Sequence, residues 1–216
     1  MLKALVIDDH DVVRLGISSL VESVPGVEIV GQGCSGEQAL KLARESRPDI
    51  VFMDIRMPGI GGLEATKRLL ASNPKVKVIV ISVFTDEIYP TQLLKAGAAG
   101  YITKSADRQE IQDALQTVIE DKVYISPAIA QQLVLKSLDP DQEGSPLATL
   151  SQRELQIAQM ITSGHRANEV AAVLNISPKT INTYKYRIYD KLDVTNDVQL
   201  TLAAVKYGLV DPDEVI

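Results

Sequence analysis

The 216-residue sequence has a single cysteine, Cys34, and lacks any long run of apolar residues. One cysteine excludes an intrachain disulfide and any zinc site built from several cysteines. No stretch approaches the roughly 18 uncharged apolar residues that a membrane span needs. The N-terminus reaches acidic residues too soon for the apolar core of a secretory signal. These absences predict a soluble cytoplasmic protein.

What is present is ordinary for a globular chain, with 45% hydrophobic and 23% charged residues. The length exceeds that of a usual single domain, so two compact units are expected. The net charge of −6 hides one basic cluster. Lys179, Lys185, Arg187 and Lys191 fall close together with a single acid, Asp190, among them. Such a cluster is typical of contact with nucleic acid.

The first half alternates short β-branched runs with helical patterns, which predicts an α/β fold with a doubly wound, five-stranded parallel sheet. The expected domain covers residues 1–122. Strands are expected over residues 4–7, 27–31, 50–53, 76–82 and 101–102, and helices over residues 12–23, 37–45, 63–72, 88–96 and 109–119.

A linker is expected over residues 123–146, with a helix over residues 128–137, because its later part is acidic and proline-containing. A second, smaller all-α domain should cover residues 147–216. Ser151 and Glu154 have the spacing of a helix-capping box, and Ser177 with Pro178 should open another helix. The expected helices span residues 152–162, 168–174, 177–192 and 197–207.

Asp8, Asp9, Asp54, Ser82 and Lys104 each lie at or just beyond the end of an expected strand. The carboxyl ends of parallel strands share one rim, so these side chains should converge. Three crowded carboxylates need a hard dication, and oxygen ligands favour Mg²⁺. Lys104 could then balance an added phosphoryl group, to which the Ser82 hydroxyl could donate.

Each of these aspartates alone could be an ordinary turn residue, and only the cluster as a whole favours a site. His10, on the turn after the first strand, is expected to be a surface or capping residue rather than a ligand. Tyr101 could be plain core.

The motifs around Asp8-Asp9, Met53-Asp54, Ser82 and Tyr101-Ile-Thr-Lys104 resemble the receiver domains of bacterial two-component response regulators. The resemblance implies that Asp54 takes a phosphoryl group from a sensor histidine kinase, with Lys104 and Ser82 assisting. It also implies that Asp9, Asp54 and the backbone carbonyl of Arg56 hold Mg²⁺ with Asp8 nearby, and that Ser82 and Tyr101 form a switch pair. Beyond weak phosphotransfer and self-dephosphorylation, no enzyme activity is implied.

In the second half, helix, turn, short helix, turn and longer helix follow the helix-turn-helix plan, in which the later helix enters the major groove. Ile181, Ile188 and Leu192 should pack inward. The DNA contacts are expected from Lys179, Thr180, Asn182, Thr183, Lys185, Tyr186, Arg187 and Lys191. The alternatives are a solvated basic helix, and packing roles for Tyr184, Tyr186 and Tyr189.

The stretches from Leu150 to Leu155, Asn168 to Ala172 and Ser177 to Tyr184 resemble LuxR-type DNA-binding domains. With a receiver in front, the chain looks like the NarL/FixJ class and most like its GacA/UvrY members. This implies a transcription factor, acting on promoters of small regulatory RNAs, whose last helix carries the dimer contact on DNA. On that helix Val198, Leu202 and Val205 are expected to face the core, leaving Leu200, Ala204 and Tyr207 as interface candidates.

The resulting hypothesis is that the unphosphorylated receiver covers the basic helix. Phosphorylation of Asp54 then draws Ser82 and Tyr101 inward, which releases the DNA-binding domain. One alternative is a phosphohydrolase with Asp54 as nucleophile. Such enzymes resemble one another in placing a second aspartate two residues later, where this chain has Arg56. The other alternative is a protein-interaction module that does not bind DNA.

Overall fold

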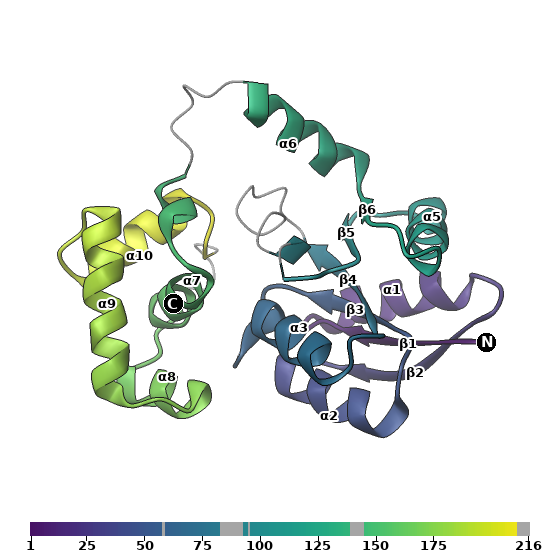
Figure 1. Cartoon of the computed structure of the whole chain (residues 1–216), viewed down its shortest axis with the longest axis horizontal. Helices are drawn as coiled ribbons and strands as arrows, with labels where there is room; N and C mark the ends of the chain where they lie inside the picture. The colour runs from purple at the N-terminus through teal and green to yellow at the C-terminus, as the bar shows by residue number, and fades with distance from the viewer. Residues whose placement is uncertain (58, 83–92, 95, 139–144, 211–216) are drawn as a thin grey trace. The chain divides into compact units, whose positions relative to one another are not determined.

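The chain forms two compact units, Met1–Asp139 and Pro140–Ile216, in a computed structural model. The structure describes residues 1–57, 59–82, 93–94, 96–138 and 145–210 (Figure 1). No helix in these ranges has the length and apolar character needed to cross a lipid bilayer.

A parallel sheet forms the centre of the first unit, with the strand order β2-β1-β3-β4-β5-β6. Every residue of β3 is buried, as expected for a central strand covered on both faces. This burial explains the continuous apolar runs in the sequence. The strands are β1 (Leu2–Ile7), β2 (Val27–Gly33), β3 (Ile50–Asp54), β4 (Lys77–Ser82), β5 (Gly100–Thr103) and β6 (Tyr124–Ile125).

The prediction of five strands was wrong by one, because β6 adds a sixth strand inside the expected linker. Tyr124 pairs with Gly100 and Ile125 pairs with Tyr101. Ser126 then donates its backbone N–H to the carbonyl of Tyr101 at 2.9 Å. A two-residue strand is too short to show the alternation from which a strand is predicted.

Helices cover both faces of the sheet (Figure 1). Side chains of α1 and α5 join one apolar cluster with β-strand residues, among them Val21, Phe52 and Leu115. The bounds are α1 (Asp11–Glu22), α2 (Gly36–Ser46), α3 (Gly61–Ser72) and α5 (Arg108–Ile119). The helix expected over residues 88–96 lies outside the described residues except for 93, 94 and 96. A further helix, α6 (Pro127–Leu138), follows β6, and its Ile129 is buried.

Within residues 145–210, the regular elements of the second unit are all helices: η1 (Pro146–Thr149), α7 (Gln152–Thr162), α8 (Ala167–Leu174), α9 (Pro178–Leu192) and α10 (Asp197–Lys206). The predicted capping box is confirmed. The Ser151 backbone N–H donates to Glu154 Oε2 at 2.7 Å, and the Glu154 N–H donates to Ser151 Oγ at 3.3 Å.

The turn between α8 and α9 is set by its capping residues. Asn175 takes a left-handed conformation with φ 52° and ends α8. Ser177 Oγ accepts the N–H of Thr180 at 3.1 Å, and Pro178 occupies the first turn of α9. Ile181 and Ile188 are fully buried, so the predicted inner face of α9 is confirmed for these two residues.

The predicted core face of α10 was wrong. Leu200 and Ala204 are fully buried, whereas Val198 is 69% and Leu202 65% exposed. Apolar residues form two stripes on this helix, and periodicity alone does not tell which stripe faces α7. The chain after α10 settles the choice, because Leu209 is buried and donates its backbone N–H to the Ala204 carbonyl at 2.7 Å.

Candidate functional site

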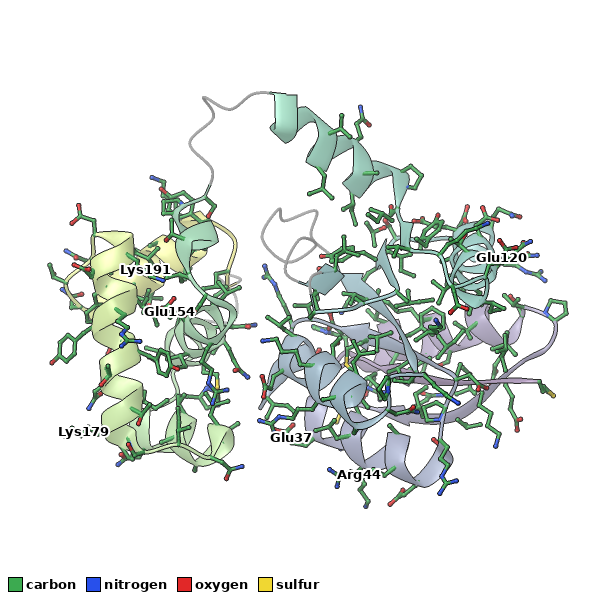
Figure 2. All side chains as sticks on the ribbon, viewed as in Figure 1. Glu37, Arg44, Glu120, Glu154, Lys179 and Lys191 are labelled. Atoms are coloured by element: carbon green, nitrogen blue, oxygen red, sulfur yellow. The ribbon has the colours of Figure 1, made fainter. Side chains whose placement is uncertain are left out.

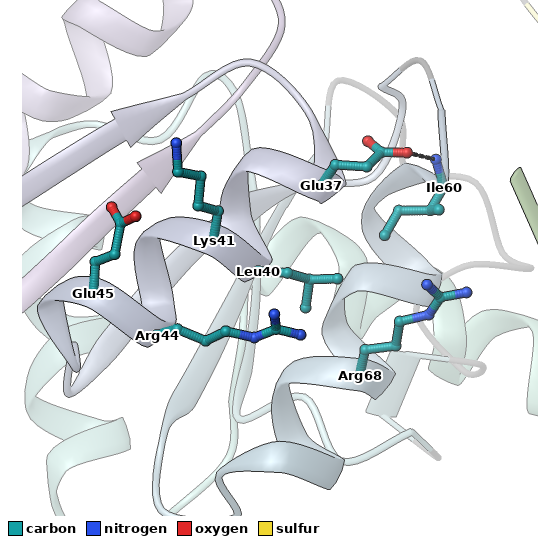
Figure 3. Close-up of a pocket in the computed structure, with 7 residues that line it drawn as sticks. All are labelled: Glu37, Leu40, Lys41, Arg44, Glu45, Ile60 and Arg68. Carbon is teal, nitrogen blue, oxygen red and sulfur yellow. Dashed lines mark hydrogen bonds between the residues drawn. The ribbon is translucent and has the colours of Figure 1, made fainter.

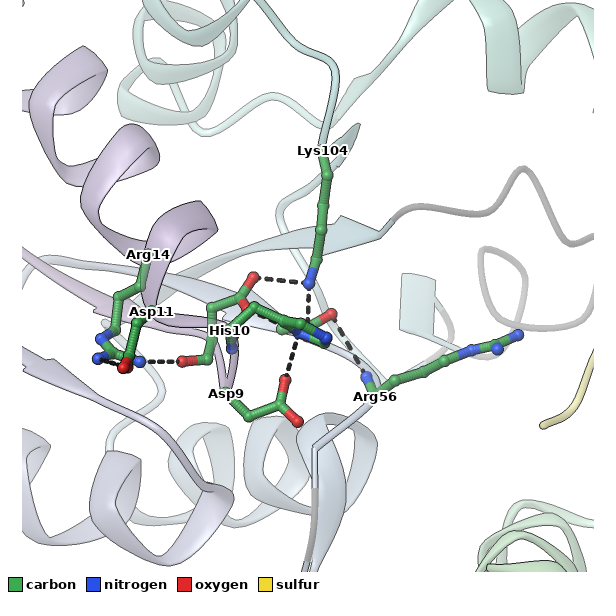
Figure 4. Close-up of polar contacts among 8 residues, drawn as sticks. Asp9, His10, Asp11, Arg14, Arg56 and Lys104 are labelled. Carbon is green, nitrogen blue, oxygen red and sulfur yellow. Dashed lines mark hydrogen bonds and ion pairs between the residues drawn. The ribbon is translucent and has the colours of Figure 1, made fainter. Parts of the chain in front are cut away.

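An acidic pocket lies at the carboxyl ends of β1 and β3 (Figure 4). β1 ends at Ile7, directly before Asp8 and Asp9, and β3 ends on Asp54. Asp8, Asp9, His10 and Asp54 each offer a ligand atom, and these atoms lie within 4.8 Å of one another. The convergence predicted from the strand ends is confirmed for these carboxylates.

Lys104 reaches the same pocket from the end of β5. Its Nζ lies 2.7 Å from Asp8 Oδ2 and 2.8 Å from Asp54 Oδ2. All three side chains are at least nine-tenths buried. The Lys104 backbone N–H donates to the Ser82 carbonyl at 2.8 Å, which ties the lysine to the end of β4. The structure therefore brings Lys104 and the three carboxylates together.

Burial decides the protonation of the pocket. It raises the pKa of Asp54 from 3.8 to about 7, the attraction of Lys104 opposes this rise, and the charges of Asp8 and Asp9 add to it. Burial lowers the pKa of Lys104, but the charge and hydrogen bonds of Asp54 and Asp8 outweigh it and leave that pKa raised. Lys104 is therefore a cation, and Asp54 exchanges its proton near neutral pH.

The donor set of the pocket fits a metal ion. Among the residues that the structure describes there, three carboxylates face the single ammonium of Lys104. This leaves an excess of two negative charges when all are ionised, which a divalent cation balances. The carboxylate oxygens are ligands for hard cations. The pocket could therefore hold a divalent ion.

His10 lies at the exposed side of this pocket. Its side chain is 59% exposed, as expected for a surface residue, and makes no capping hydrogen bond to α1. Nδ1 lies 2.9 Å from Asp9 Oδ1 and 3.5 Å from Asp8 Oδ1. The imidazole thus contacts the acid pair.

Sequence reasoning missed Arg14. Its Nη1 donates to the backbone carbonyl of Asp8 at 2.7 Å, and its guanidinium pairs with Asp11 (Figure 4). The side chain is only 17% exposed. Arg14 therefore fixes the loop that carries the acid pair, and its position one turn into α1 was the available signal.

Ser82 and Tyr101 are both buried on adjacent strands. Ser82 is 3% exposed and Tyr101 0%. In the β4–β5 register Tyr101 pairs with Val80, and Ser82 pairs with Thr103. The tyrosine therefore lies on β5 two positions before the level of Ser82.

The buried carboxyl of Asp54 predicts a pH-dependent stability. Between pH 3.8 and about 7 the folded protein keeps a proton that the unfolded chain has released, so the free energy of unfolding falls as the pH rises through this window. Asp54→Asn removes this cost. Without divalent ions, we expect its gain in melting temperature over wild type to be small at about pH 4 and largest above about pH 7. A gain that does not change with pH would refute the assigned burial.

The second site is the outer face of α9. Lys179, Asn182, Thr183, Tyr186 and Arg187 are exposed there, Tyr186 at 72%. Cations, an amide, a hydroxyl and an aromatic ring share this face. Such a surface can contact phosphates and base edges.

Two further lysines of α9 are held in ion pairs. Lys185 Nζ lies 2.8 Å from Asp197 Oδ2, and Tyr189 donates its hydroxyl to the same carboxylate. Lys191 Nζ lies 2.7 Å from Glu154 Oε2, whose side chain is buried (Figure 2). In the sequence Lys185 and Lys191 cluster with Lys179 and Arg187, but in the structure they are held in ion pairs with Asp197 and Glu154.

Known proteins match both units. The family described as "Response regulator receiver domain" matches residues 4–116, and "Bacterial regulatory proteins, luxR family" matches residues 148–204. "Response regulator GacA" of Pseudomonas aeruginosa is 53% identical over 211 residues, 98% of this chain and 99% of the relative. "Response regulator UvrY" of Escherichia coli is 44% identical over 213 residues, 99% of this chain and 98% of the relative.

A solved structure shares the fold. RcsB of Salmonella enterica serovar Typhimurium, solved bound to the promoter rprA with the phosphomimetic BeF3-, has a TM-score of 0.73 at 21% identity. The match covers 94% of this chain and 97% of that one. Taken with the acidic pocket and the helix-turn-helix, these matches show that the chain belongs to the response regulators of the luxR family, in which a receiver domain is joined to a DNA-binding domain that regulates transcription.

Proposed function

We propose that this chain accepts a phosphoryl group on Asp54 from a sensor histidine kinase and thereby controls its own sequence-specific binding to DNA. The observation that carries the proposal is the buried pair of Asp54 and Lys104, with Asp8 and Asp9 beside it. A nucleophilic carboxylate, a cation and a divalent-ion site in one pocket are what phosphoryl transfer needs. The receiver spans residues 1–122 and the DNA-binding domain residues 147–216 in this proposal.

In the transfer step, an oxygen of the Asp54 carboxylate forms a bond to phosphorus. The phosphorus–nitrogen bond of the donor histidine breaks, and its electron pair stays on the imidazole nitrogen. Lys104 Nζ, already 2.8 Å from Asp54 Oδ2, is placed to pair with a phosphoryl oxygen. Asp8, Asp9, Asp54 and the backbone carbonyl of Arg56 would hold Mg²⁺, which neutralises phosphoryl charge when bound.

The response to phosphorylation is proposed to run through Ser82 and Tyr101. The Ser82 hydroxyl is buried at the end of β4, where it can donate to a phosphoryl oxygen. Tyr101, on the adjacent strand β5, is already wholly buried, so its proposed response is a change of side-chain packing and not the inward movement expected from the sequence. Phosphorylation acts as a population shift between two packings of this edge of the receiver.

DNA binding is assigned to α9. Lys179, Thr180, Asn182, Thr183, Tyr186 and Arg187 are proposed to contact the major groove and its phosphates directly. Lys185 and Lys191 would have to exchange Asp197 and Glu154 for phosphate. The targets proposed from the likeness to GacA and UvrY are genes of small regulatory RNAs.

A homodimer on DNA is proposed to form through α10. Val198 and Leu202 lie one turn apart on its exposed face, and no contact in the described part of this chain covers them. Two-fold pairing of this apolar stripe would present two copies of α9 to half-sites one helical turn apart.

Selection of bound duplexes from a random pool tests the function. We expect enrichment of a two-fold symmetric sequence, stronger when acetyl phosphate and Mg²⁺ are present than when they are absent. If the bound duplexes show no enriched sequence under either condition, this would contradict sequence-specific binding and favour the protein-interaction alternative.

The ion pairs of α9 predict different effects for two lysines. Lys179→Ala should make the slope of log K against log salt shallower by about 1, because one phosphate contact is lost. Lys191→Ala should instead lower the melting temperature, because it leaves the buried Glu154 carboxylate without its cation. Fluorescence anisotropy in a salt series and thermal unfolding measure the two effects. Equal effects of both variants on the salt slope would contradict the distinction.

A further inference from the structure

The start of α2 lies against the loop that follows β3 (Figure 3). Glu37, in the first turn of α2, accepts a hydrogen bond from the backbone N–H of Ile60 through Oε1 at 3.0 Å. The bond joins two points 23 residues apart in the sequence. Ile60 is 3% exposed, and a buried N–H needs an acceptor. Glu37 supplies one.

Two glycines show how closely this loop is packed. A Cβ on Gly59, which has a φ of 79°, would lie 2.4 Å from Glu37 Oε1. A Cβ on Gly62 would lie 1.8 Å from the backbone carbonyl oxygen of Asp54. The chain is therefore closely packed between the Glu37 carboxylate and the end of β3. Glycine is required at Gly62 because the contact is with rigid backbone, and at Gly59 because its φ is positive.

A backbone hydrogen bond joins the first turn of α3 to the residue that follows β3. The N–H of Gly62 donates to the carbonyl of Ile55 at 3.0 Å. Ile55 lies between Asp54, the proposed phosphoacceptor, and Arg56, whose backbone carbonyl is a proposed metal ligand. The Arg56 N–H also donates to Asp54 Oδ1 at 3.4 Å. The bond from Ile60 to Glu37 therefore holds the nearby Gly62 in place. Gly62 in turn holds Ile55, and with it the backbone on either side at Asp54 and Arg56.

We propose that Glu37 is a positioning residue for the divalent-ion site: its hydrogen bond to Ile60 holds the loop in the conformation in which Asp54 and Arg56 serve the same ion. Glu37 does not touch the ion. Its effect comes from the bond and not from its charge, because the contact is to a neutral N–H group. The inference rests on the proposed function of the pocket.

The test is calorimetric titration of Mg²⁺ into the full chain, with no phosphodonor present. Glu37→Ala is expected to weaken Mg²⁺ affinity about tenfold, the range seen when groups that orient metal ligands are removed. Glu37→Gln keeps an oxygen acceptor and should bind as wild type does. Glu37→Asp keeps the charge but is one methylene too short to reach Ile60, and should bind as weakly as Glu37→Ala. Glu45→Ala, two turns further along α2, is the matched control and should be unchanged.

The outcomes separate the inference from the function on which it rests. Wild-type affinity in Glu37→Ala and Glu37→Asp would overturn the role of Glu37 and leave the proposed function standing. Loss of affinity in Glu37→Gln with retention in Glu37→Asp would overturn it too, because charge would then be the cause. Absence of Mg²⁺ binding to the wild-type chain would refute the proposed site itself. Urea unfolding of each variant adds a structural readout. A variant with wild-type stability and weaker Mg²⁺ binding supports the positioning role. If Glu37→Ala does not fold, the comparison of Mg²⁺ affinity between Glu37→Asp and Glu37→Gln tests the inference.

Discussion

Replacement of Asp54 by asparagine is expected to abolish phosphoryl acceptance from acetyl phosphate in the presence of Mg²⁺. The amide cannot form the acyl phosphate, and the other carboxylates cannot take its place. Asp8 is 1% exposed and bonded to Lys104 and to the backbone N–H of His10, while Asp9 contacts His10. Mass spectrometry of the intact protein should show one added phosphoryl group on wild type and none on the variant.

A matched substitution separates the site from a general effect of removing a carboxylate. Asp113, on α5, is exposed and accepts a hydrogen bond from Gln109 at 2.9 Å, away from the acidic pocket. Asp113→Asn should be phosphorylated as wild type is. Phosphorylation of Asp54→Asn at the wild-type level would place the acceptor at another residue and remove the basis of the proposed switch.

Replacement of Leu202 by aspartate is expected to lower affinity for the selected operator about 100-fold, because two linked half-site contacts become two separate ones. The Leu202 side chain is 65% exposed in the single chain, so the variant should fold. In the proposed dimer a carboxylate would be buried beside its symmetry copy, which is strongly unfavourable. An anisotropy titration measures the affinity, and sedimentation of the protein–DNA complex shows whether the dimer still forms.

Leu200 provides the contrasting variant on the same helix. It is fully buried, so Leu200→Asp should unfold the second unit, whereas Leu202→Asp should keep the wild-type melting temperature. A DNA-bound dimer of Leu202→Asp with wild-type affinity would exclude this face of α10 as the interface.

The acidic pocket was predictable because strand ends fix where residues converge. Asp8, Asp9 and Lys104 follow buried strands and Asp54 ends one, so even boundaries wrong by a residue or two left them at the same rim. The helix caps were predictable for a similar reason. Ser151 with Glu154, and Ser177 with Pro178, are local signals whose hydrogen bonds depend only on neighbouring backbone.

Features that depend on distant contacts could not be predicted. Which face of α10 is exposed depends on the chain after the helix, where Leu209 bonds back to Ala204. The strand β6 forms only because it pairs with β5. The Lys191 ion pair joins side chains 37 positions apart. The hydrogen bond from Ile60 to Glu37 was not predicted either, because no local pattern shows that a side chain at the start of one helix reaches a backbone N–H 23 residues away.

The most direct test is an anisotropy titration of the wild-type chain onto one selected operator duplex, with Mg²⁺ present and with or without acetyl phosphate. Control of DNA binding by Asp54 requires the phosphodonor to tighten binding about tenfold, a typical coupling between two sites. The same shift must be missing in Asp54→Asn. Identical binding curves for the wild-type chain with and without the phosphodonor, while mass spectrometry shows it to be phosphorylated, would contradict that control.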